Sequence, residues 1–593
     1  MSLDSEEFAE LRRLYPDLDP SLFDDVHGVF ERLQCPGGTE LIREGDTADG
    51  LYILLNGRLR VTKKTEDGRI HVVGEISRGE MVGEMGLLGE GARTATVTAI
   101  RDSDLLRLST DTFYQLLQRH PGVSQQLFRV LMARLGRPAP PERLSTVAVI
   151  DRDASERTRG SIRALTSALC EGNRVLLLNA AIVEQALGQG SAQAEAGTRG
   201  HEALAGWLND QERAHQLVIY LPDATPTAWT QRCLRQADRV LIVADANASP
   251  ALSLIEQFIL TRNHAATELA LVHATDSDRP EGTARWLESR QPRQHHHLRE
   301  GSGDDIARLA RHLLGRSLGL VLGGGGAKAL SQIGVLRAMA EAGIAVDLVG
   351  GTSMGSAIGA LVASGLDHRE IARLMRDMVR LRPFRGITYP ILALLSGRRL
   401  NRVINQLFAD RRIEDLWLRY FCVSCNLSRL AVAVHESGPL SLWVRASSAI
   451  PGIMPPALDN GELHVDGALL NNLPADVMRR IGAGAIITCN VSAAEPLRSE
   501  FDFGASPSGW NLLLRRFAGQ KFPGAGRVLF RSVLLASAQH AESVRAFSDV
   551  YLTPPVAGHE INDWNAIDNL IELGYRYASE SIPHWKLPTF EAR

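Results

Sequence analysis

The stretch Val346-Asp-Leu-Val-Gly-Gly-Thr-Ser-Met-Gly-Ser-Ala-Ile-Gly-Ala360 decides the fold of the C-terminal part of the chain. A short apolar run leads into Gly351-Thr-Ser-Met-Gly355, and small residues in a helical pattern follow. A G-x-S-x-G sequence between a buried strand and a helix places its serine on a sharp turn, with the hydroxyl above the sheet. Glycines flank Ser353 because a Cβ at either position would collide where strand and helix pack closely. The alternative is an ordinary glycine-rich turn, so the neighbouring motifs must decide.

Upstream, Ser317-Leu-Gly-Leu-Val-Leu-Gly-Gly-Gly-Gly-Ala-Lys-Ala-Leu330 predicts a strand, a run of four glycines and a helix. Consecutive glycines let backbone amides converge at a helix N-terminus, where the helix dipole favours an anion. Beside a nucleophilic serine, such a loop is an oxyanion hole. A phosphate-binding P-loop is the alternative, but its pattern requires Ser or Thr after the lysine, and Ala329 follows Lys328.

Downstream, Asp466-Gly467 closes the strand-like start of Leu463-His-Val-Asp-Gly-Ala-Leu-Leu-Asn-Asn-Leu-Pro474. No histidine stands in an obvious catalytic motif. His464 lies on the same strand face as Asp466, because strand side chains alternate, but a strand histidine is more often structural. We therefore expect a two-residue site of Ser353 and Asp466. An aspartate is a weak base at neutral pH, so the site must desolvate it to raise its pKa.

In this order, Gly-Gly-Gly-x-Lys, G-x-S-x-G and Asp-Gly-Ala resemble the motifs of the patatin-like phospholipases. The segment Val444-Arg-Ala-Ser-Ser-Ala-Ile-Pro-Gly-Ile-Met-Pro-Pro456 is similar to the bacterial relatives of neuropathy target esterase. The resemblance covers roughly residues 316–590. It implies that Ser353 is the nucleophile and Asp466 its base. It also implies an oxyanion hole made by the backbone amides of Gly324, Gly325 and Gly326.

Two departures from the family pattern concern geometry. Lys328-Ala329 stands where the family usually carries Arg-Gly, and lysine lacks the planar fork of arginine. Ala468 stands where a second glycine is common after Asp-Gly. Neither change removes a reacting group.

From about Phe23 to Leu135 the sequence predicts many short strands separated by glycine turns, which is typical of a small barrel or jelly roll. Leu51–Leu55 and Leu59–Val61 alternate around Asn56-Gly57 and predict a β-hairpin. Asp111 is the candidate N-cap of a helix that follows the last strand.

Within this region, residues 81–97 are similar to the phosphate-binding cassette of cyclic-nucleotide-binding domains. Gly83 and Gly86 are expected to bracket a short helical turn whose amides face a phosphate. The resemblance implies that Glu84 accepts a hydrogen bond from a ribose hydroxyl and that Arg93 pairs with the cyclic phosphate. Thr94 follows, as in domains that prefer guanine. The alternative is a barrel that has kept its shape and lost its ligand.

Pro138-Ala-Pro-Pro141 marks a linker, after which apolar strands alternate with helices. This alternation of strands and helices predicts a central parallel α/β layer of Rossmann-like type. Its expected strands are Thr146–Ile150, Arg174–Leu178, Leu217–Leu221, Arg239–Val243 and Leu269–His273. The first strand–helix loop, 151–158, lacks the glycines and lysine of a P-loop. We therefore expect a scaffold or interdomain relay that does not hydrolyse nucleotide.

A chain of 593 residues exceeds one hydrophobic core. We expect a multidomain α/β protein with a cyclic-nucleotide-binding jelly roll and its helical lead in residues 1–137. The central α/β domain occupies 138–315, and the patatin-like α/β hydrolase domain 316–593.

The net charge of −3 and the absence of a strongly basic domain argue against nucleic acid as a partner. Six cysteines in this length fit a reducing compartment, and Cys422-Val-Ser-Cys425 is a lone pair inside a strand, expected to be buried and structural. No signal sequence and no apolar run of about 20 residues is present. The expected location is the cytoplasm, with peripheral contact at the inner face of the membrane.

Two segments of the sequence allow more than one interpretation. Ile387–Ile404 joins apolar residues to Arg398, Arg399 and Arg402, which fits either contact with a lipid headgroup layer or a buried helix with a solvated end. Residues 496–545 are basic in places and predict a flap or docking surface.

The expected function is hydrolysis of acyl esters of lysophospholipid or phospholipid by a Ser-Asp dyad. No metal or cofactor is needed for catalysis, and cAMP or cGMP is the expected regulatory ligand. One alternative is a catalytically inactive, cyclic-nucleotide-responsive lipid-binding or signalling scaffold. A transcription regulator is disfavoured because no basic recognition helix follows Leu135. The oligomeric state is not readable from the sequence.

Overall fold

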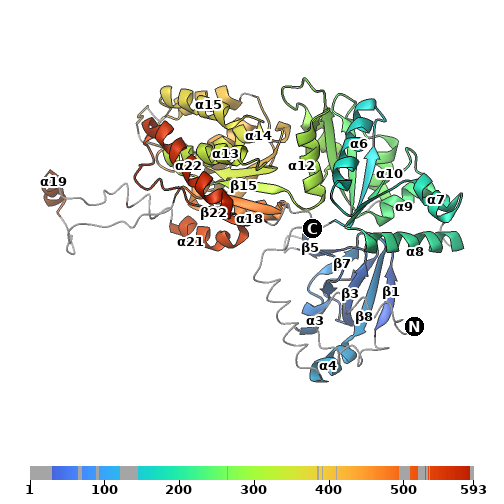
Figure 1. Ribbon diagram of the computed structural model, residues 1–593. Coiled ribbons are helices and arrows are strands. Elements are labelled where there is room, and N and C mark those ends of the chain that lie inside the picture. Colours follow the sequence, from blue (N-terminus) through green and yellow to red (C-terminus); the bar gives the residue numbers. More distant parts are fainter. Residues whose placement is uncertain are drawn as a thin grey trace. The chain divides into compact units, whose positions relative to one another are not determined.

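The computed structural model describes residues 30–64, 70–88, 92–119, 144–195, 198–262, 265–383, 386–389, 391–408, 410–492, 508–517, 528, 532 and 535–587. The chain forms two compact units (Figure 1). One comprises residues 1–139, 143–276 and 285–310, and the other comprises 140–142, 277–284 and 311–593. The expected helical lead (1–21), the proline linker and most of 496–545 lie outside the described residues.

The first unit begins with two four-stranded antiparallel sheets, as a jelly roll requires. One sheet has the order β1 (Glu31–Cys35), β8 (Ser103–Ser109), β3 (Gly50–Asn56), β6 (Met81–Val82). The other has the order β2 (Glu40–Ile42), β7 (Thr96–Ala99), β4 (Leu59–Lys64), β5 (Ile70–Ile76). Apolar side chains from both sheets, including Leu54, Leu59, Val97 and Leu105, form the core between them. Helices α3 (Glu84–Leu88) and α4 (Thr110–Arg119) complete this domain.

The predicted hairpin at Asn56-Gly57 is wrong. β3 pairs with β8 and β6, whereas β4 pairs with β5 and β7, so the turn carries the chain from one sheet to the other. All seven residues of β3 are buried, which an exposed two-stranded hairpin would not give. The Asn56 side chain donates to Asn209 of the α/β layer, and a Cβ on Gly57 would meet Ser103. Tertiary packing, and not the local turn signal, therefore sets the pairing.

The N-cap prediction at Asp111 is also wrong by two residues. The amide of Thr112 donates to the Ser109 hydroxyl, and Asp111 lies inside the first turn of α4. Its carboxylate still faces the positive end of the helix dipole.

The rest of the first unit is a six-stranded, wholly parallel sheet. Its order is β10 (Val175–Leu178), β11 (Leu217–Tyr220), β9 (Thr146–Asp151), β12 (Arg239–Asp245), β13 (Ala266–His273), β14 (Gln294–Arg299). The connecting helices are α6 (Glu156–Cys170), α7 (Ala180–Leu187), α8 (Arg199–Ala214), α9 (Ala228–Gln236), α10 (Leu254–Arg262), α11 (Thr283–Arg290) and α12 (Gly303–Leu313). The five predicted strands are present. β14 was not predicted, because three consecutive histidines hide its strand pattern.

Buried ion pairs join the jelly roll to the α/β layer. Arg101, on the turn between β7 and β8, pairs with Glu212 at 2.9 Å and with Asp238 at 2.7 Å, and all three side chains are almost wholly buried. Arg58 pairs with Glu75 at 2.7 Å and lies 3.6 Å from Asp238. Charges removed from water this completely must stay paired. The two domains therefore form one compact unit.

The second unit is built on an eight-stranded mixed sheet. Its order is β19 (Ala457–Asp459), β20 (Glu462–Asp466), β17 (Arg419–Asn426), β16 (Leu348–Thr352), β15 (Leu318–Leu322), β21 (Ala485–Cys489), β22 (Val550–Leu552), and β18 (Ala431–His435) also pairs with β17. The central strands are parallel, whereas β20 and β18 run antiparallel to β17. This order places the ends of β16 and β20 one strand apart.

Helices cover both faces of this sheet (Figure 1). Leu320 and Leu322 of β15 face a core shared with α13 (Ser331–Glu341), α14 (Met354–Ala363), α15 (His368–Arg380) and α22 (Ile567–Ser581). Val321 faces the opposite core, which includes residues of α18 (Ala475–Arg480) and α21 (Leu535–Val544). The other helices are α16 (Arg398–Phe408), α17 (Leu440–Ser447) and α19 (Gly509–Phe517).

Helices α13 and α22 meet backbone to backbone. A Cβ on Gly334 would lie 1.9 Å from the Ile571 carbonyl oxygen, and one on Gly574 would lie 1.9 Å from that of Ser331. The two glycines therefore let the C-terminal helix lie directly against the helix that follows the glycine loop. In the part of the chain that the structure describes, no helix is both long and apolar enough to cross a membrane.

Candidate active site

Ser353 lies on a strained turn between β16 and α14. Its φ of 55° and ψ of −129° are unusual for a residue with a side chain. A Cβ on Gly351 would lie 2.6 Å from the carbonyl oxygen of Leu322, and a Cβ on Gly355 would lie 2.2 Å from the same oxygen. The predicted need for both glycines is confirmed, because β15 runs directly beneath the turn.

The hydroxyl of Ser353 donates to Oδ2 of Asp466 at 2.7 Å. Asp466 ends β20, and its other carboxylate oxygen accepts the amide of Ala468 at 2.9 Å. Its own amide donates to the carbonyl of Ala449, which fixes the backbone at this position. The structure thus brings together the two residues that the sequence singled out.

Burial raises the pKa of Asp466 to about 7, although the hydrogen bonds from Ala468 and Ser353 act to lower it. The carboxylate is almost wholly buried, and no cationic side chain of the described residues pairs with it. A carboxyl group with a pKa near 7 is half deprotonated at neutral pH and is then basic enough to accept a proton. This is the desolvation that a two-residue site requires.

The glycine loop lies against the nucleophile. A Cβ on Gly324 would lie 2.7 Å from the Cβ of Ser353. The amide of Gly324, however, donates to Oδ1 of Asn472 at 3.0 Å, so in this structure it does not supply the predicted oxyanion donor. Among the described residues, the amides of Gly325 and Gly326 have no acceptor. Gly326 has a φ of 58°, which suits glycine.

Asn472 is the residue that sequence reasoning missed. Its side chain accepts the Gly324 amide and donates to the Gly324 carbonyl at 3.2 Å and to the Ser492 hydroxyl at 3.1 Å. One carboxamide therefore holds both the backbone amide and the backbone carbonyl of Gly324 in the glycine loop. The only signal was its place, six residues after Asp466 in a segment that is apolar apart from Asn471 and Asn472.

Ser447, at the end of α17, holds the backbone of the nucleophile. Its hydroxyl accepts the amide of Ser353 at 2.9 Å and donates to the carbonyl of Val423 at 2.7 Å. It belongs to the segment 444–456 that carried the family resemblance, and this contact gives the serine there a structural role.

His464 does not contact the dyad. Its Nδ1 lies 3.0 Å from the Ser424 hydroxyl, which also lies 2.7 Å from Nε2 of His435. Burial lowers the pKa of both rings, that of His435 to about 3. They are therefore neutral at physiological pH and pack as a structural group with Trp443, which stacks on His435.

The cysteine pair on β17 is buried and unoxidised. Burial raises the pKa of the Cys422 thiol to about 12 and that of Cys425 to about 11. Such thiols are poor nucleophiles and poor metal ligands at neutral pH, in keeping with the structural role predicted for them.

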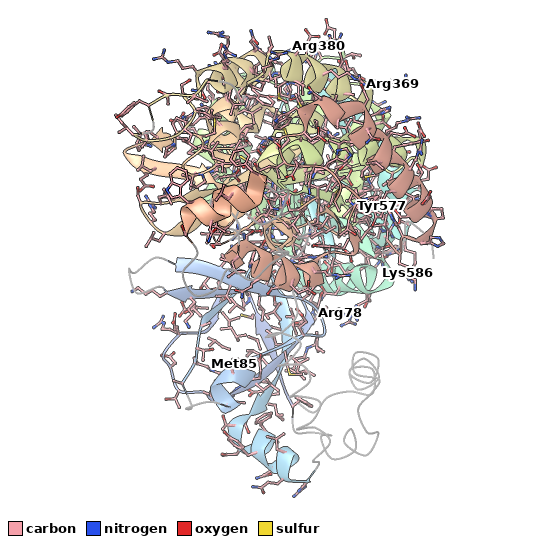
Figure 2. The ribbon with its side chains drawn as sticks, turned by 90° about the vertical axis from the view of Figure 1, so that its left-hand side faces the viewer. Arg78, Met85, Arg369, Arg380, Tyr577 and Lys586 are labelled. Carbon is pink, nitrogen blue, oxygen red and sulfur yellow. The ribbon has the colours of Figure 1, made fainter. Side chains whose placement is uncertain are left out.

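The cassette residues of the jelly roll surround α3. Gly83 has a φ of 96° just before the helix, and Glu84 begins it. Gly86 lies inside the helix and does not end it, which corrects its predicted place. Glu84 is buried, whereas Thr94 and Met85 are exposed (Figure 2).

Arg93 is already held by the protein. Its guanidinium donates to the carbonyls of Gly83 at 3.1 Å and Gly50 at 2.9 Å, and pairs with the carboxylate of Asp49. Asp49 also accepts from Arg107 at 2.9 Å. An anion at this position would share Arg93 with Asp49.

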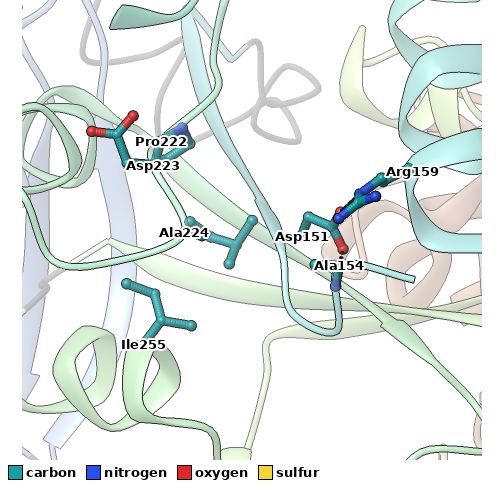
Figure 3. Close-up of a pocket in the computed structure, with 8 residues that line it drawn as sticks. Asp151, Ala154, Arg159, Pro222, Asp223, Ala224 and Ile255 are labelled. Carbon is teal, nitrogen blue, oxygen red and sulfur yellow. Dashed lines mark hydrogen bonds and ion pairs between the residues drawn. The ribbon is translucent and has the colours of Figure 1, made fainter. Parts of the chain in front are cut away.

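A cavity of about 190 Å³ lies at the carboxyl ends of β9 and β11 in the α/β layer (Figure 3). Asp151 and Asp223 line it together with Arg159. The carboxylate of Asp151 accepts the amide of Ala154 at 3.0 Å and the hydroxyl of Thr158 at 2.7 Å. The amide of Ala154 and the hydroxyl of Thr158 are therefore both engaged by this carboxylate.

Three family models match the chain in succession. They are described as cyclic nucleotide-binding domain (residues 32–120), Neuropathy Target Esterase family P-loop like domain (143–313) and patatin-like phospholipase (320–479). Residues 320–479 therefore form a patatin-like phospholipase domain. The middle domain is the one that the Neuropathy Target Esterase family model matches.

Patatin-like phospholipase domain-containing protein 6 of Homo sapiens is 35% identical over 92% of this chain and 44% of its own length. Patatin-like phospholipase domain-containing protein 7 of Rattus norvegicus is 33% identical over 99% of this chain and 48% of its own length. Lysophospholipase nte1 of Aspergillus oryzae is 30% identical over 96% of this chain and 42% of its own length. The chain thus spans less than half the length of these relatives.

Among solved structures, the regulatory domain of Toxoplasma gondii PKA with cAMP is 32% identical over 19% of this chain and 46% of that one. Its TM-score is 0.18, so this likeness adds nothing to the domain assignment.

Proposed function

We propose that this chain is a serine esterase that hydrolyses acyl esters of lysophospholipids or phospholipids. The observation that carries the proposal is the 2.7 Å hydrogen bond from the Ser353 hydroxyl to Asp466, at a strained turn beside the glycine loop. The name of the fungal relative, a lysophospholipase, supports the choice of substrate class.

In the proposed reaction, the Ser353 oxygen attacks the ester carbonyl carbon while Asp466 takes the hydroxyl proton. The tetrahedral oxyanion accepts hydrogen bonds from the amides of Gly325 and Gly326. Asp466 then returns its proton to the departing alcohol, leaving an acyl-serine. Water, deprotonated by the same carboxylate, attacks this ester and releases the fatty acid.

The strained backbone at Ser353 keeps the oxygen at the start of α14, where the positive helix end also favours the developing anion. The pKa of Asp466, raised to about 7 by burial, matches its part as acid and base near neutral pH. All six cysteines are free thiols, which supports the cytoplasm as the place of the reaction.

The test measures fatty-acid release from a panel of lysolipids and diacyl lipids. Ser353→Ala and Asp466→Asn should each reduce turnover at least a thousandfold while the circular dichroism spectrum stays that of the wild type. A fluorophosphonate should label the wild type and leave Ser353→Ala unlabelled. Full activity in Ser353→Ala would refute the proposal, and an unlabelled, inactive wild type would favour the scaffold alternative.

We further propose that the jelly roll binds cAMP or cGMP and that binding changes esterase output. Arg93 and Glu84 in the matched domain support this second function. Because Arg93 already pairs with Asp49, the cyclic phosphate must compete for the guanidinium. Calorimetry with each nucleotide, on the wild type and Arg93→Ala, tests binding. Esterase assays with and without nucleotide then test coupling, which requires different affinities for two enzyme states.

A further inference from the structure

The loop between α15 and α16 carries large apolar side chains into solvent. Ile387, Tyr389 and Ile391 are each more than 80% exposed, and Leu392 and Leu394 are more than half exposed. Single exposed apolar residues are ordinary, but a run of five within eight positions marks a site of interaction. The sequence allowed two interpretations of residues 387–404, contact with lipid headgroups or a buried helix. Only the second half is such a helix, with Leu400, Val403, Ile404 and Phe408 buried.

This loop is ordered at its base. Ile387 and Leu395 form a β-bridge, the amide of Thr388 donates to Leu394, and that of Ser396 donates to Gly386. The exposed apolar residues between these contacts therefore belong to a hydrogen-bonded loop and not to a frayed end. We call the described residues 386–389 and 391–396 the apolar loop.

Basic residues flank the apolar loop in the sequence. From Met378 to Phe408 the sequence holds six arginines and neither aspartate nor glutamate. Arg398, Arg399 and Arg402 are exposed on α16, and among the described residues no carboxylate pairs with them. Arg380, in the last turn of α15, lies at the surface (Figure 2) and has only an exposed pairing with Asp377.

The apolar loop is attached to the chain segment that holds the catalytic aspartate. The amides of Leu394 and Leu395 donate to the carbonyls of Gly452 and Ile453, each at 2.9 Å. Three residues before Gly452, the carbonyl of Ala449 accepts the amide of Asp466. Residues 449–453 thereby connect the apolar loop to the backbone of Asp466.

We propose that the apolar loop and the arginines around it dock this hydrolase on a lipid bilayer that contains anionic phospholipids. The apolar side chains enter the boundary between headgroups and acyl chains, and the arginines contact the phosphates. Exposed apolar side chains beside the exposed Arg398, Arg399 and Arg402 fit a surface that is apolar inside and anionic outside. The part of the proposal that concerns substrate delivery rests on the proposed esterase function, whereas the docking itself does not.

The experiment uses the full chain and two vesicle preparations, phosphatidylcholine alone and equimolar phosphatidylcholine with phosphatidylserine. One variant combines Ile387→Ser, Ile391→Ser and Leu392→Ser, and a second combines Arg398→Gln, Arg399→Gln and Arg402→Gln. Leu430→Ser is the matched control, because this leucine is equally exposed but lies on the β17–β18 turn. These side chains are exposed, so the substitutions should not disturb folding.

Co-sedimentation of the wild type should be strong with anionic vesicles, weak with neutral ones, and reduced by salt. The serine variant should lose at least tenfold of its partitioning, the glutamine variant should lose the preference for anionic vesicles, and Leu430→Ser should behave as the wild type. Wild-type partitioning in the serine variant would overturn the proposal. So would equal binding to both vesicles, or a change from dimer to monomer in that variant without any vesicle binding.

Activity separates docking from catalysis. The ratio of fatty-acid release from vesicles to hydrolysis of a soluble butyrate ester should fall at least tenfold in the serine variant. If the wild type hydrolyses neither substrate but still sediments with anionic vesicles, the proposed function fails and the docking stands. If both activities are present and sedimentation is not, the docking fails and the proposed function stands.

Helix α19 provides an internal comparison. Trp510, Leu514 and Phe517 lie four and three positions apart on one face and are all exposed. Trp510→Ser with Phe517→Ser should leave the loop-dependent partitioning in place. Loss of vesicle binding in this variant alone would move the docking surface away from the apolar loop and overturn the proposal.

Discussion

Ser353 and Asp466 are 113 positions apart in the chain, and their side chains meet at 2.7 Å. The sheet order explains the distance. β16 ends at Thr352, directly before Ser353, and lies beside β17. β20, which ends at Asp466, lies on the other side of β17 and runs in the opposite direction. An antiparallel strand therefore brings its carboxyl end to the nucleophile from across one neighbour.

The rate of hydrolysis should depend on the ionisation of Asp466. With a pKa of about 7, the carboxyl group is protonated in acid and cannot accept the serine proton. We expect kcat/KM for a soluble ester to rise about tenfold per pH unit below pH 7 and to level off above it. A profile that is flat between about pH 5 and pH 8 would contradict this role for Asp466.

Asp466→Asn should stabilise the fold in a pH-dependent way. The folded-state pKa, about 7, lies above the ordinary value of 3.8, so the folded state holds the proton more tightly. Wild-type stability is therefore fullest below about pH 4 and falls as the pH rises to 7. The neutral amide escapes this loss.

The free energy of unfolding of Asp466→Asn, relative to the wild type, should therefore rise by roughly 2–4 kcal/mol between about pH 4 and pH 8. Urea denaturation across this range measures it. Asp377→Asn, at an exposed position on α15, is the control. An unchanged difference between variant and wild type would show that the Asp466 carboxyl is not held in a desolvated environment.

Gly355→Ala should abolish activity and destabilise the hydrolase by at least about 3 kcal/mol, because its Cβ would lie 2.2 Å from a backbone oxygen that cannot move freely. Gly160→Ala is the matched control. Gly160 also lies within a helix, but nothing stands within 4 Å of its missing Cβ, so alanine should stabilise it slightly. Thermal unfolding followed by circular dichroism compares the two, and a well-folded, active Gly355→Ala would disprove the close approach of strand and helix.

Asn472→Ala should lower kcat about 10- to 100-fold with little change in KM. The backbone of Gly324 would lose two hydrogen bonds, so the amides of Gly325 and Gly326 would no longer be held in one orientation. Asn472→Asp should be worse, since it adds a negative charge where an oxyanion forms. Steady-state kinetics on a soluble ester are the measurement, with the exposed Asn569→Ala as control. An unaltered kcat in both Asn472 variants would mean that the loop holds its conformation alone.

Arg101→Ala should destabilise the first unit by about 3–5 kcal/mol, because it leaves Glu212 buried without its cation and Asp238 with only the more distant Arg58. Arg163, whose pairing with Glu156 is fully exposed, should tolerate alanine within about 0.5 kcal/mol. Calorimetry on the full chain should show a lower first transition only for Arg101→Ala. Equal transitions in both variants would show that these charges do not join the jelly roll to the α/β layer.

The sequence predicted the elements whose signals are local. The strand–turn–helix around Ser353 follows from its glycines, and the five apolar strands of the α/β layer follow from their composition. Asp466 was found because aspartate before glycine at the end of a strand is itself a local pattern.

What the sequence could not predict depends on contacts between distant residues. The partners of β3 and β4 are chosen by the two sheets as wholes, so the turn at Asn56-Gly57 was misread as a hairpin. Asn472 acts on a peptide 148 positions away, and no neighbouring residue marks it. For the same reason the sequence did not show that the amide of Gly324 donates to Asn472, which leaves the amides of Gly325 and Gly326 as the proposed oxyanion donors.

The close packing of Gly334 against α22 also bears on how the hydrolase can be produced in isolation. The matched patatin-like region stops at residue 479, yet β21 lies in the middle of the sheet beside β15, and Ala327 donates to the carbonyl of Ile561. A recombinant fragment cut at the end of that region would expose the edge of β15 and strip the cover from α13. Any fragment meant for crystallisation or screening should run to Leu587, and a shorter one should be expected in inclusion bodies.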